Sequence, residues 1–139
     1  MVRRLALAGA LLVLAGVPAA AEHEVYYRFT VLGYVKDAQG RPVADAQVDV
    51  VRDKTGFKYL GESDAQGFYF VRTRLGDESR GETLTVRQGK TTRRVTVAFD
   101  PANQTDERGT RLDFEGGRAI ERVTWFRSTL LNVVGVTRH

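Results

Sequence analysis

The side chains that most often serve as catalytic nucleophiles and bases are scarce in this chain of 139 residues. The chain has no cysteine, and its two histidines are His23 and His139, one near each end. A Ser-His-Asp or Cys-His nucleophile needs a base that the folded scaffold holds in place. We therefore expect no catalytic residues of this kind, and we expect that the chain is not an enzyme.

Carboxylates are more frequent, but turns and strand faces explain them. Asp37 and Asp64 each begin the same four-residue sequence, D-A-Q-G. In such a turn the Asp side chain accepts hydrogen bonds from nearby backbone amides, and Gly takes the left-handed conformation. Neither Asp lies in a dense loop of acidic side chains of the kind that binds calcium. We therefore assign both to turns. Turns and solvated strand faces also explain Asp45, Asp49 and Glu62. We expect neither a metal nor a cofactor.

Short alternations of apolar and polar residues recur along the chain and are separated by turn signals. Gln88-Gly89-Lys90 is typical of a hairpin turn. The pattern predicts an all-β fold, an antiparallel β-sandwich of about seven strands with a C-terminal extension of uncertain structure. The expected strands cover residues 25–36, 46–52, 57–62, 68–74, 82–87 and 92–99.

One face of the first and fourth expected strands is unusually aromatic for a surface exposed to water. Val31 and Val35 alternate with Leu32 and Tyr34, so the first pair faces the core and the second pair faces away from it. A soluble monomer rarely leaves such an apolar patch uncovered. We therefore expect a binding surface on this outer face, with two anchors from the C-terminal segment. Its candidate residues are Tyr26, Leu32, Tyr34, Phe68, Phe70, Arg72, Trp125 and Phe126.

The first 21 residues have the pattern of an export signal. Arg3 and Arg4 precede an apolar run, and Ala19-Ala20-Ala21 ends it with small residues. We expect cleavage after about Ala21 and a periplasmic or secreted mature protein without a membrane span. Loss of the two arginines lowers the formal charge from +4 to +2, which gives no reason to expect a nucleic-acid partner.

The mature chain divides into three segments by composition. Residues 22–100 hold the expected sandwich, and residues 101–117 look like a polar linker. Residues 118–139 are apolar, and we expect them to pack on the sandwich or on a partner. Their period fits a helix through Ile120, Val123 and Phe126, whereas the β-branched residues Thr124 and Val133 favour a strand. We favour strand or extended structure for part of this segment.

Two motifs connect the chain to a known family. From Val31 to Val50 the sequence follows V-x-G-x-V-x-D-x-x-G-x-P-x-x-x-A-x-V-x-V, and S-D-x-x-G-x-Y follows from Ser63 to Tyr69. Over about residues 29–99 the chain resembles the carboxypeptidase regulatory-like domain. The resemblance implies a transthyretin-like (prealbumin-like) β-sandwich, and it implies a non-catalytic module attached to exported enzymes, outer-membrane receptors or adhesive proteins. We expect this chain to depart from that pattern, as a module without an accompanying enzyme or barrel.

Two enzyme families share this sandwich, and their motifs fit the chain poorly. Hydroxyisourate hydrolases need histidines and an arginine at strand ends and a C-terminal Tyr-Arg-Gly-Ser, for which Phe126-Arg127-Ser128 is a poor substitute. Intradiol dioxygenases need two tyrosines and two histidines around iron, and both histidines here lie outside the expected sandwich. We keep a transthyretin-like hydrolase as a remote alternative only.

These observations lead to an exported, non-catalytic accessory or interaction module, a subunit or helper of a cell-envelope or secreted assembly. Its expected partner is another exported or envelope protein, or a second copy of the chain. The alternative is a carbohydrate- or small-ligand-binding domain, because aromatic rings beside Arg72 suit sugars and anions. A glycan is therefore a further candidate partner.

Overall fold

The computed structural model describes residues 27–133, so the expected signal peptide and Tyr26 lie outside the described residues. Within 27–133 the chain forms eight strands, two short 3-10 helices and one α-helix. The strands are β1 (Phe29–Lys36), β2 (Gln47–Arg52), β3 (Lys58–Glu62), β4 (Phe68–Thr73), β5 (Thr83–Gln88), β6 (Thr91–Thr96), β7 (Gly109–Glu115) and β8 (Arg118–Glu121). The helices are η1 (Asp77–Ser79), η2 (Val123–Trp125) and α2 (Phe126–Val133).

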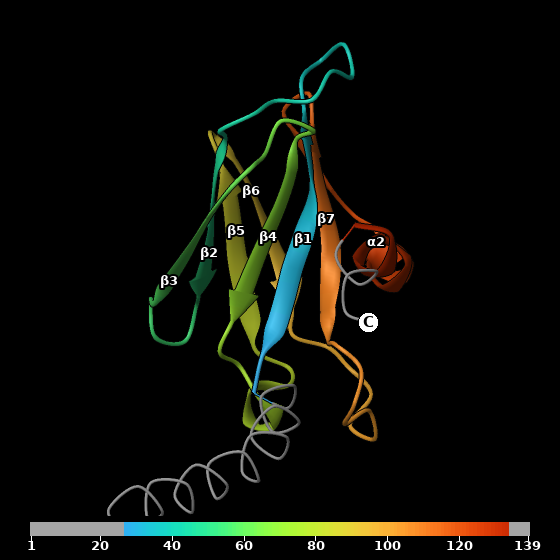
Figure 1. Cartoon of the computed structure of the whole chain (residues 1–139). Helices are drawn as coiled ribbons and strands as arrows, with labels where there is room; N and C mark the ends of the chain where they lie inside the picture. The colour runs from blue at the N-terminus through green and yellow to red at the C-terminus, as the bar shows by residue number, and fades with distance from the viewer. Residues whose placement is uncertain (1–26, 134–139) are drawn as a thin grey trace, which may run out of the picture.

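The strands form two four-stranded sheets that pack face to face (Figure 1). One sheet has the order β4-β1-β7-β8 and the other β3-β2-β5-β6. The expected all-β sandwich is therefore confirmed. The structure refines it in two respects: there are eight strands, and β1 and β7 run parallel while every other neighbouring pair is antiparallel.

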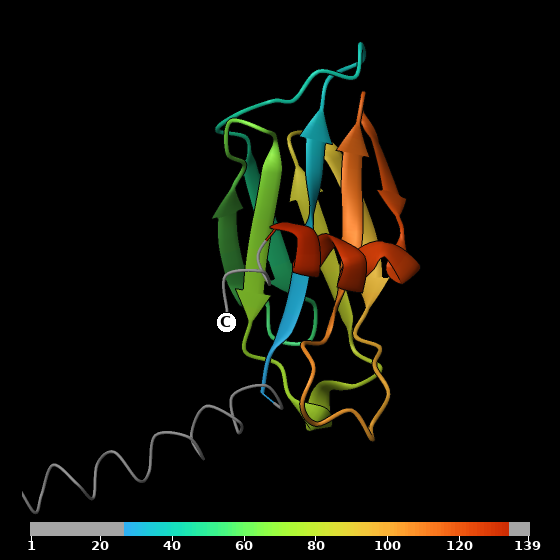
Figure 2. The ribbon, with the colours of Figure 1, turned by 45° about the vertical axis from the view of Figure 1, so that its right-hand side comes forward.

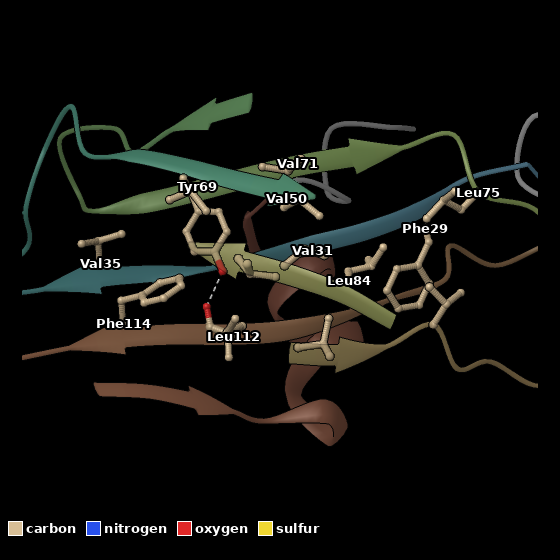
Figure 3. Packing of buried hydrophobic residues seen from close by; sticks show 14 of the residues in the cluster. Phe29, Val31, Val35, Val50, Tyr69, Val71, Leu75, Leu84, Leu112 and Phe114 are labelled. Carbon is tan, nitrogen blue, oxygen red and sulfur yellow. Dashed lines mark hydrogen bonds between the residues drawn. The ribbon is translucent and has the colours of Figure 1, made fainter. Parts of the chain in front are cut away.

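The core lies between the sheets and follows the alternation in the sequence. Val31 and Val35 of β1 face Val48 and Val50 of β2 across this layer, and all four are buried (Figure 3). Tyr69 is also buried, and its hydroxyl donates a hydrogen bond of 2.5 Å to the Leu112 carbonyl. Burial raises the pKa of Tyr69 well above its ordinary value. The hydroxyl therefore stays protonated and ties β4 to β7.

The repeated D-A-Q-G sequences form the same turn. The Asp37 Oδ1 atom accepts hydrogen bonds of 2.9 Å from the amides two and four residues further along the chain, and Asp64 Oδ1 does the same. Gly40 and Gly67 close the turns at φ +81°, which only Gly adopts without strain. Within residues 27–133, no group of three or more His, Cys, Asp or Glu side chains is placed to hold a metal ion.

The expected linker at 101–117 differs most from the sequence prediction. Its second half forms β7, a central strand whose Leu112 and Phe114 are buried. Asp113 and Arg108 are buried as well, and both are ion-paired. Because paired charges can be buried, a segment that looked polar became an inner strand.

The segment after β7 covers the outer face of the first sheet. Residues Arg118–Glu121 form β8, in accord with the expected strand, whereas 126–133 form helix α2, which the β-branched residues did not indicate. Figure 2 shows α2 lying across β1 and β7. The Phe126 ring packs directly on Gly109, where a Cβ atom would come within 2.5 Å of that ring. No helix among residues 27–133 has the length and apolar character to cross a membrane.

Candidate functional site

Most of the binding residues expected from the sequence gather beneath helix α2. Leu32, Phe68 and Phe126 form a second buried cluster, and Tyr34 and Phe70 pack against it. The Tyr34 and Phe68 rings lie 5.3 Å apart. The structure thus brings these side chains together, but it does so by packing them against one another inside a single chain.

Trp125 extends the outer face as part of a stack of cations and aromatic rings. The Arg111 guanidinium lies 5.1 Å from the Tyr34 ring centroid and 5.2 Å from that of Trp125. Arg122 lies 5.2 Å from the Trp125 centroid, and Lys36 lies 5.7 Å from that of Tyr34. Such contacts stabilise the fold by roughly 0.5–2 kcal/mol each. The remaining expected residue, Arg72, lies 5.0 Å above the Phe70 ring.

The arginines of this stack are neutralised by one buried and one partly exposed carboxylate. Asp113 is fully buried, and it accepts hydrogen bonds from the Arg111 side chain and the Tyr34 amide. Arg122 bonds both Asp113 and Glu115. The hydrogen bond to Glu115, opposed by burial and supported by Asp113, raises the pKa of Arg122 above its ordinary value. Because Arg111 and Arg122 are already paired, these two guanidinium groups have little charge to offer an anion.

An open pocket lies at the far edge of the other sheet, where β2 turns into β3. It has a volume of about 590 Å³, within the range of small-molecule pockets. Two aromatic residues and two arginines line it, from β2, the turn after β2, β3 and the segment directly after β4. The lining residues are Arg52, Thr55, Gly56, Phe57, Tyr59 and Arg74.

The local sequence places the two rings side by side. Gly56 takes φ +79° in the turn after β2, and the Thr55 hydroxyl accepts a hydrogen bond from the Phe57 amide. Phe57 is 59% exposed, and its ring meets the Tyr59 ring edge-on at 4.8 Å. The Tyr59 hydroxyl accepts a hydrogen bond of 3.2 Å from the Arg74 amide. The pocket therefore combines the exposed Phe57 ring with the Tyr59 hydroxyl, which a hydrogen bond joins to Arg74.

The two arginines of this pocket differ in what they already bind. Arg52 makes two hydrogen bonds of 2.8 and 2.7 Å to Glu82, which raise the pKa of Arg52 and lower the pKa of Glu82. The Arg74 side chain is exposed and has no ion-pair partner among the described residues. Arg74 is therefore the cation that this pocket can present to a ligand.

A smaller depression of about 420 Å³ lies between the β1–β2 loop and the β7–β8 turn. Lys36, Asp37, Glu115 and Arg118 line it, so it mixes both signs of charge, and its lining includes no aromatic ring. It offers less to a specific ligand than the pocket beside β3.

The sequence contained one signal for the pocket beside β3. Phe57 and Tyr59 alternate directly after the polar bend at 53–56, at the start of an expected strand. The missing part was Arg74, which lies at the end of another strand and reaches the pocket only through the packing of β3 beside β4. That long-range contact cannot be derived from local spacing.

No protein-family model and no curated protein sequence matches this chain. Solved structures with a similar arrangement include chlorocatechol 1,2-dioxygenase from Pseudomonas putida, with 17% identity and a TM-score of 0.46 over 69% of this chain and 61% of that one. A second is the dioxygenase domain of a carbohydrate-binding fusion protein from Streptomyces sp. SirexAA-E, with 19% identity and a TM-score of 0.37, covering 68% of this chain and 75% of that one. A third is 3-chlorocatechol 1,2-dioxygenase from Rhodococcus opacus 1CP, at 14% identity and a TM-score of 0.40, covering 69% and 61%.

These comparisons correct two expectations. The neighbours are enzymes, so the expectation of a non-catalytic accessory module, and of a chain that is not an enzyme, is withdrawn. At this level of identity the likeness concerns the sandwich fold alone. The chain spans about 61% of the length of the Pseudomonas enzyme, and no substrate or catalytic residue is transferred from it.

The described residues do not fit the iron site that intradiol dioxygenases need. Residues 27–133 contain no histidine, and His23 and His139 lie outside the described residues. Among the tyrosines in this range, Tyr69 donates its hydroxyl to a carbonyl in the core, and Tyr59 accepts a backbone amide. The two tyrosines are therefore engaged in holding strands together, and we derive no reaction through a metal.

Proposed function

We propose that the pocket beside β3 binds a planar organic anion, with the ring of the ligand on Phe57 and its anionic group on Arg74. One observation carries the proposal: an exposed aromatic ring lines the same pocket as a guanidinium that has no ion-pair partner within residues 27–133. On the outer face of the other sheet, by contrast, Phe68 and Phe126 are buried, and Arg111 and Arg122 are paired with carboxylates.

The chemistry of the lining selects for both parts of such a ligand. An aromatic ring gains roughly 0.5–1.5 kcal/mol from an offset or edge contact with another ring, beyond the area that it buries. A guanidinium binds a carboxylate through two parallel hydrogen bonds. Because Glu82 already binds Arg52, that guanidinium is neutralised, and Arg74 is the group of this pocket that can bind the anion.

Benzoate is the simplest probe of this proposal. A compound of its size is expected to bind with a dissociation constant of about 1–10 mM, given typical binding energies per atom. Isothermal titration calorimetry should rank benzoate above acetate, which lacks the ring, and above benzyl alcohol, which lacks the charge. Equal binding of all three compounds would contradict the proposal.

Substitutions test separately the ring contact of Phe57 and the ionic contact of Arg74. Phe57→Ala should weaken benzoate binding about fivefold, and Phe57→Tyr should retain it. Arg74→Gln should weaken it about threefold, since exposed ion pairs are modest. Arg87→Gln is the matched control, because it removes one exposed positive charge from the same sheet outside the pocket. Unchanged affinity in both Phe57→Ala and Arg74→Gln would place the ligand elsewhere.

We further propose that the protein is exported and belongs with the carboxypeptidase regulatory-like domains. The n-region, the apolar run and the small residues before Glu22 support export. The matched turns at Asp37 and Asp64 support the family. Mass spectrometry of the protein from an exporting host should find a mature chain that starts at about Glu22; an intact first residue in the exported fraction would contradict cleavage.

A further inference from the structure

Strand β3 is an edge strand with an open hydrogen-bonding side (Figure 1). It pairs with β2 through residues of odd number, because Phe57 and Ser63 at its two ends bond backbone groups on that side. Backbone groups alternate in direction along a strand. The amides and carbonyls of Lys58, Leu60 and Glu62 therefore point away from β2, and no backbone hydrogen bond within residues 27–133 engages them.

The outward side chains of this edge are exposed, and they follow the order cation, apolar residue, anion. Lys58, Leu60 and Glu62 share the outer face of the sheet, and Leu60 is 64% exposed. An exposed edge strand with an apolar centre is a template for another strand. Among residues 27–133, no loop or helix covers this edge, whereas α2 covers the outer face of the other sheet.

We propose that β3 pairs antiparallel with β3 of a second copy of the chain, about a two-fold axis at Leu60. In this register Leu60 lies opposite Leu60, and Lys58 lies opposite Glu62 of the second copy on both sides of the axis. The outward backbone groups form about six new hydrogen bonds. Shifting the register by two residues would place Leu60 opposite a charged side chain, so charge complementarity selects the symmetric pairing.

The result is a continuous eight-stranded sheet across the dimer. A two-fold arrangement uses the same patch on both copies, so the assembly closes at two. The strand has only five residues, which makes the interface small. We therefore expect a dissociation constant on the order of 10–100 µM, typical of a weak interface.

Charge exchange tests the register directly. Lys58→Glu places two carboxylates opposite each other, and Glu62→Lys places two ammonium groups opposite each other, so each single variant should dimerise at least about fivefold more weakly. The double variant Lys58→Glu/Glu62→Lys restores the opposite charges and should recover the wild-type constant. Lys90→Glu is the matched control, because it makes the same charge change in the turn between β5 and β6.

Sedimentation velocity between 1 µM and 1 mM measures these constants. Leu60→Pro removes an outward amide that makes no bond to β2, so it should abolish the dimer while the monomer stays folded by circular dichroism. Recovery in the double variant, with no change in Lys90→Glu, supports the proposal. The proposal is overturned if the wild-type protein stays monomeric at 1 mM. It is also overturned if neither single charge reversal changes the dimer dissociation constant. The benzoate titration does not depend on this result, because the two contacts that it tests, Phe57 and Arg74, lie outside the paired residues 58–62.

Discussion

Two regions of this molecule combine aromatic rings with arginines: one is covered and its arginines are paired, and the other is exposed. On the outer face of the β4-β1-β7-β8 sheet, helix α2 covers the rings, and Asp113 pairs the arginines. At the edge of the other sheet, Phe57 and Leu60 are exposed, and the Arg74 side chain has no ion-pair partner among the described residues. The first region is a folding unit, and the second is available to a ligand or another chain.

The difference shows that residue type alone does not distinguish a binding surface from a core. The two regions have similar sequences, because in each of them aromatic and cationic residues occur in strands with an alternating pattern. What separates them is a covering element and a counter-charge, and both come from residues 108–133, far along the chain. The predictions that follow test whether the covered region contributes stability and the open region does not.

The largest effect is expected at the buried carboxylate. Asp113→Ala leaves Arg111 and Arg122 without their shared partner beneath α2, so it should lower the free energy of unfolding by about 3–5 kcal/mol. Urea denaturation followed by circular dichroism measures this loss. Asp49→Ala is the control on the other sheet, where the carboxylate accepts one hydrogen bond from the described residues, from the Gln47 side-chain amide. It should change stability by less than about 0.5 kcal/mol.

The next effect compares two phenylalanines of opposite exposure. Phe126 is 6% exposed and Phe57 is 59% exposed. Phe126→Ala should cost about 3–4 kcal/mol and release α2 from the sheet, because a large buried ring is lost. Phe57→Ala should cost less than about 1 kcal/mol. Equal losses in urea denaturation would show that the two regions do not differ in the way described.

A smaller effect concerns the Arg52–Glu82 pair behind the pocket. The hydrogen bonds from Arg52 hold the pKa of Glu82 below its ordinary value of 4.5. Because the folded-state pKa is the lower one, the pair stabilises the protein fully above pH 4.5, and this contribution is lost as the pH falls through the folded-state pKa. Glu82→Gln should therefore cost about 1–2 kcal/mol at pH 7.

That cost should shrink as unfolding is measured at pH 4 and then at pH 3, because the wild-type carboxyl becomes protonated as well. The two proteins converge in stability at low pH if the pair acts as described. A difference that stays constant from pH 7 to pH 3 would show that the Glu82 side chain contributes by packing, without its charge.

Much of the sandwich follows from local pattern. Val48, Val50 and Tyr69 alternate with polar neighbours, and the Asp37 and Asp64 turns have a local mechanism, so these parts were predicted correctly. Strand β7 was missed because Asp113 and the preceding Arg108 are charged. Their burial depends on ion pairs with Arg122, which follows β8, and with Asp77, which is remote in the sequence. The alternation of Thr110, Leu112 and Phe114 was the signal that could have found it.

The candidate site was less accessible to sequence reasoning than the fold. The outer-face residues were correctly placed away from the core, but the cover over them came from a segment expected to be partly extended. The pocket depends on Arg74 reaching the turn after β2, and the β3 edge depends on the final strand order. Strand order is a property of the whole chain, and no local pattern contains it.

The most direct measurement is a titration of ¹⁵N-labelled protein with benzoate, followed by two-dimensional NMR. Trp125 is the single tryptophan, so its indole N–H signal reports on the outer face alone. We expect the amide signals of Phe57, Tyr59 and Arg74 to shift with one binding constant while the Trp125 indole and the Tyr34 amide stay in place. Shifts confined to Trp125 and Tyr34, with an unmoved pocket, would contradict the account.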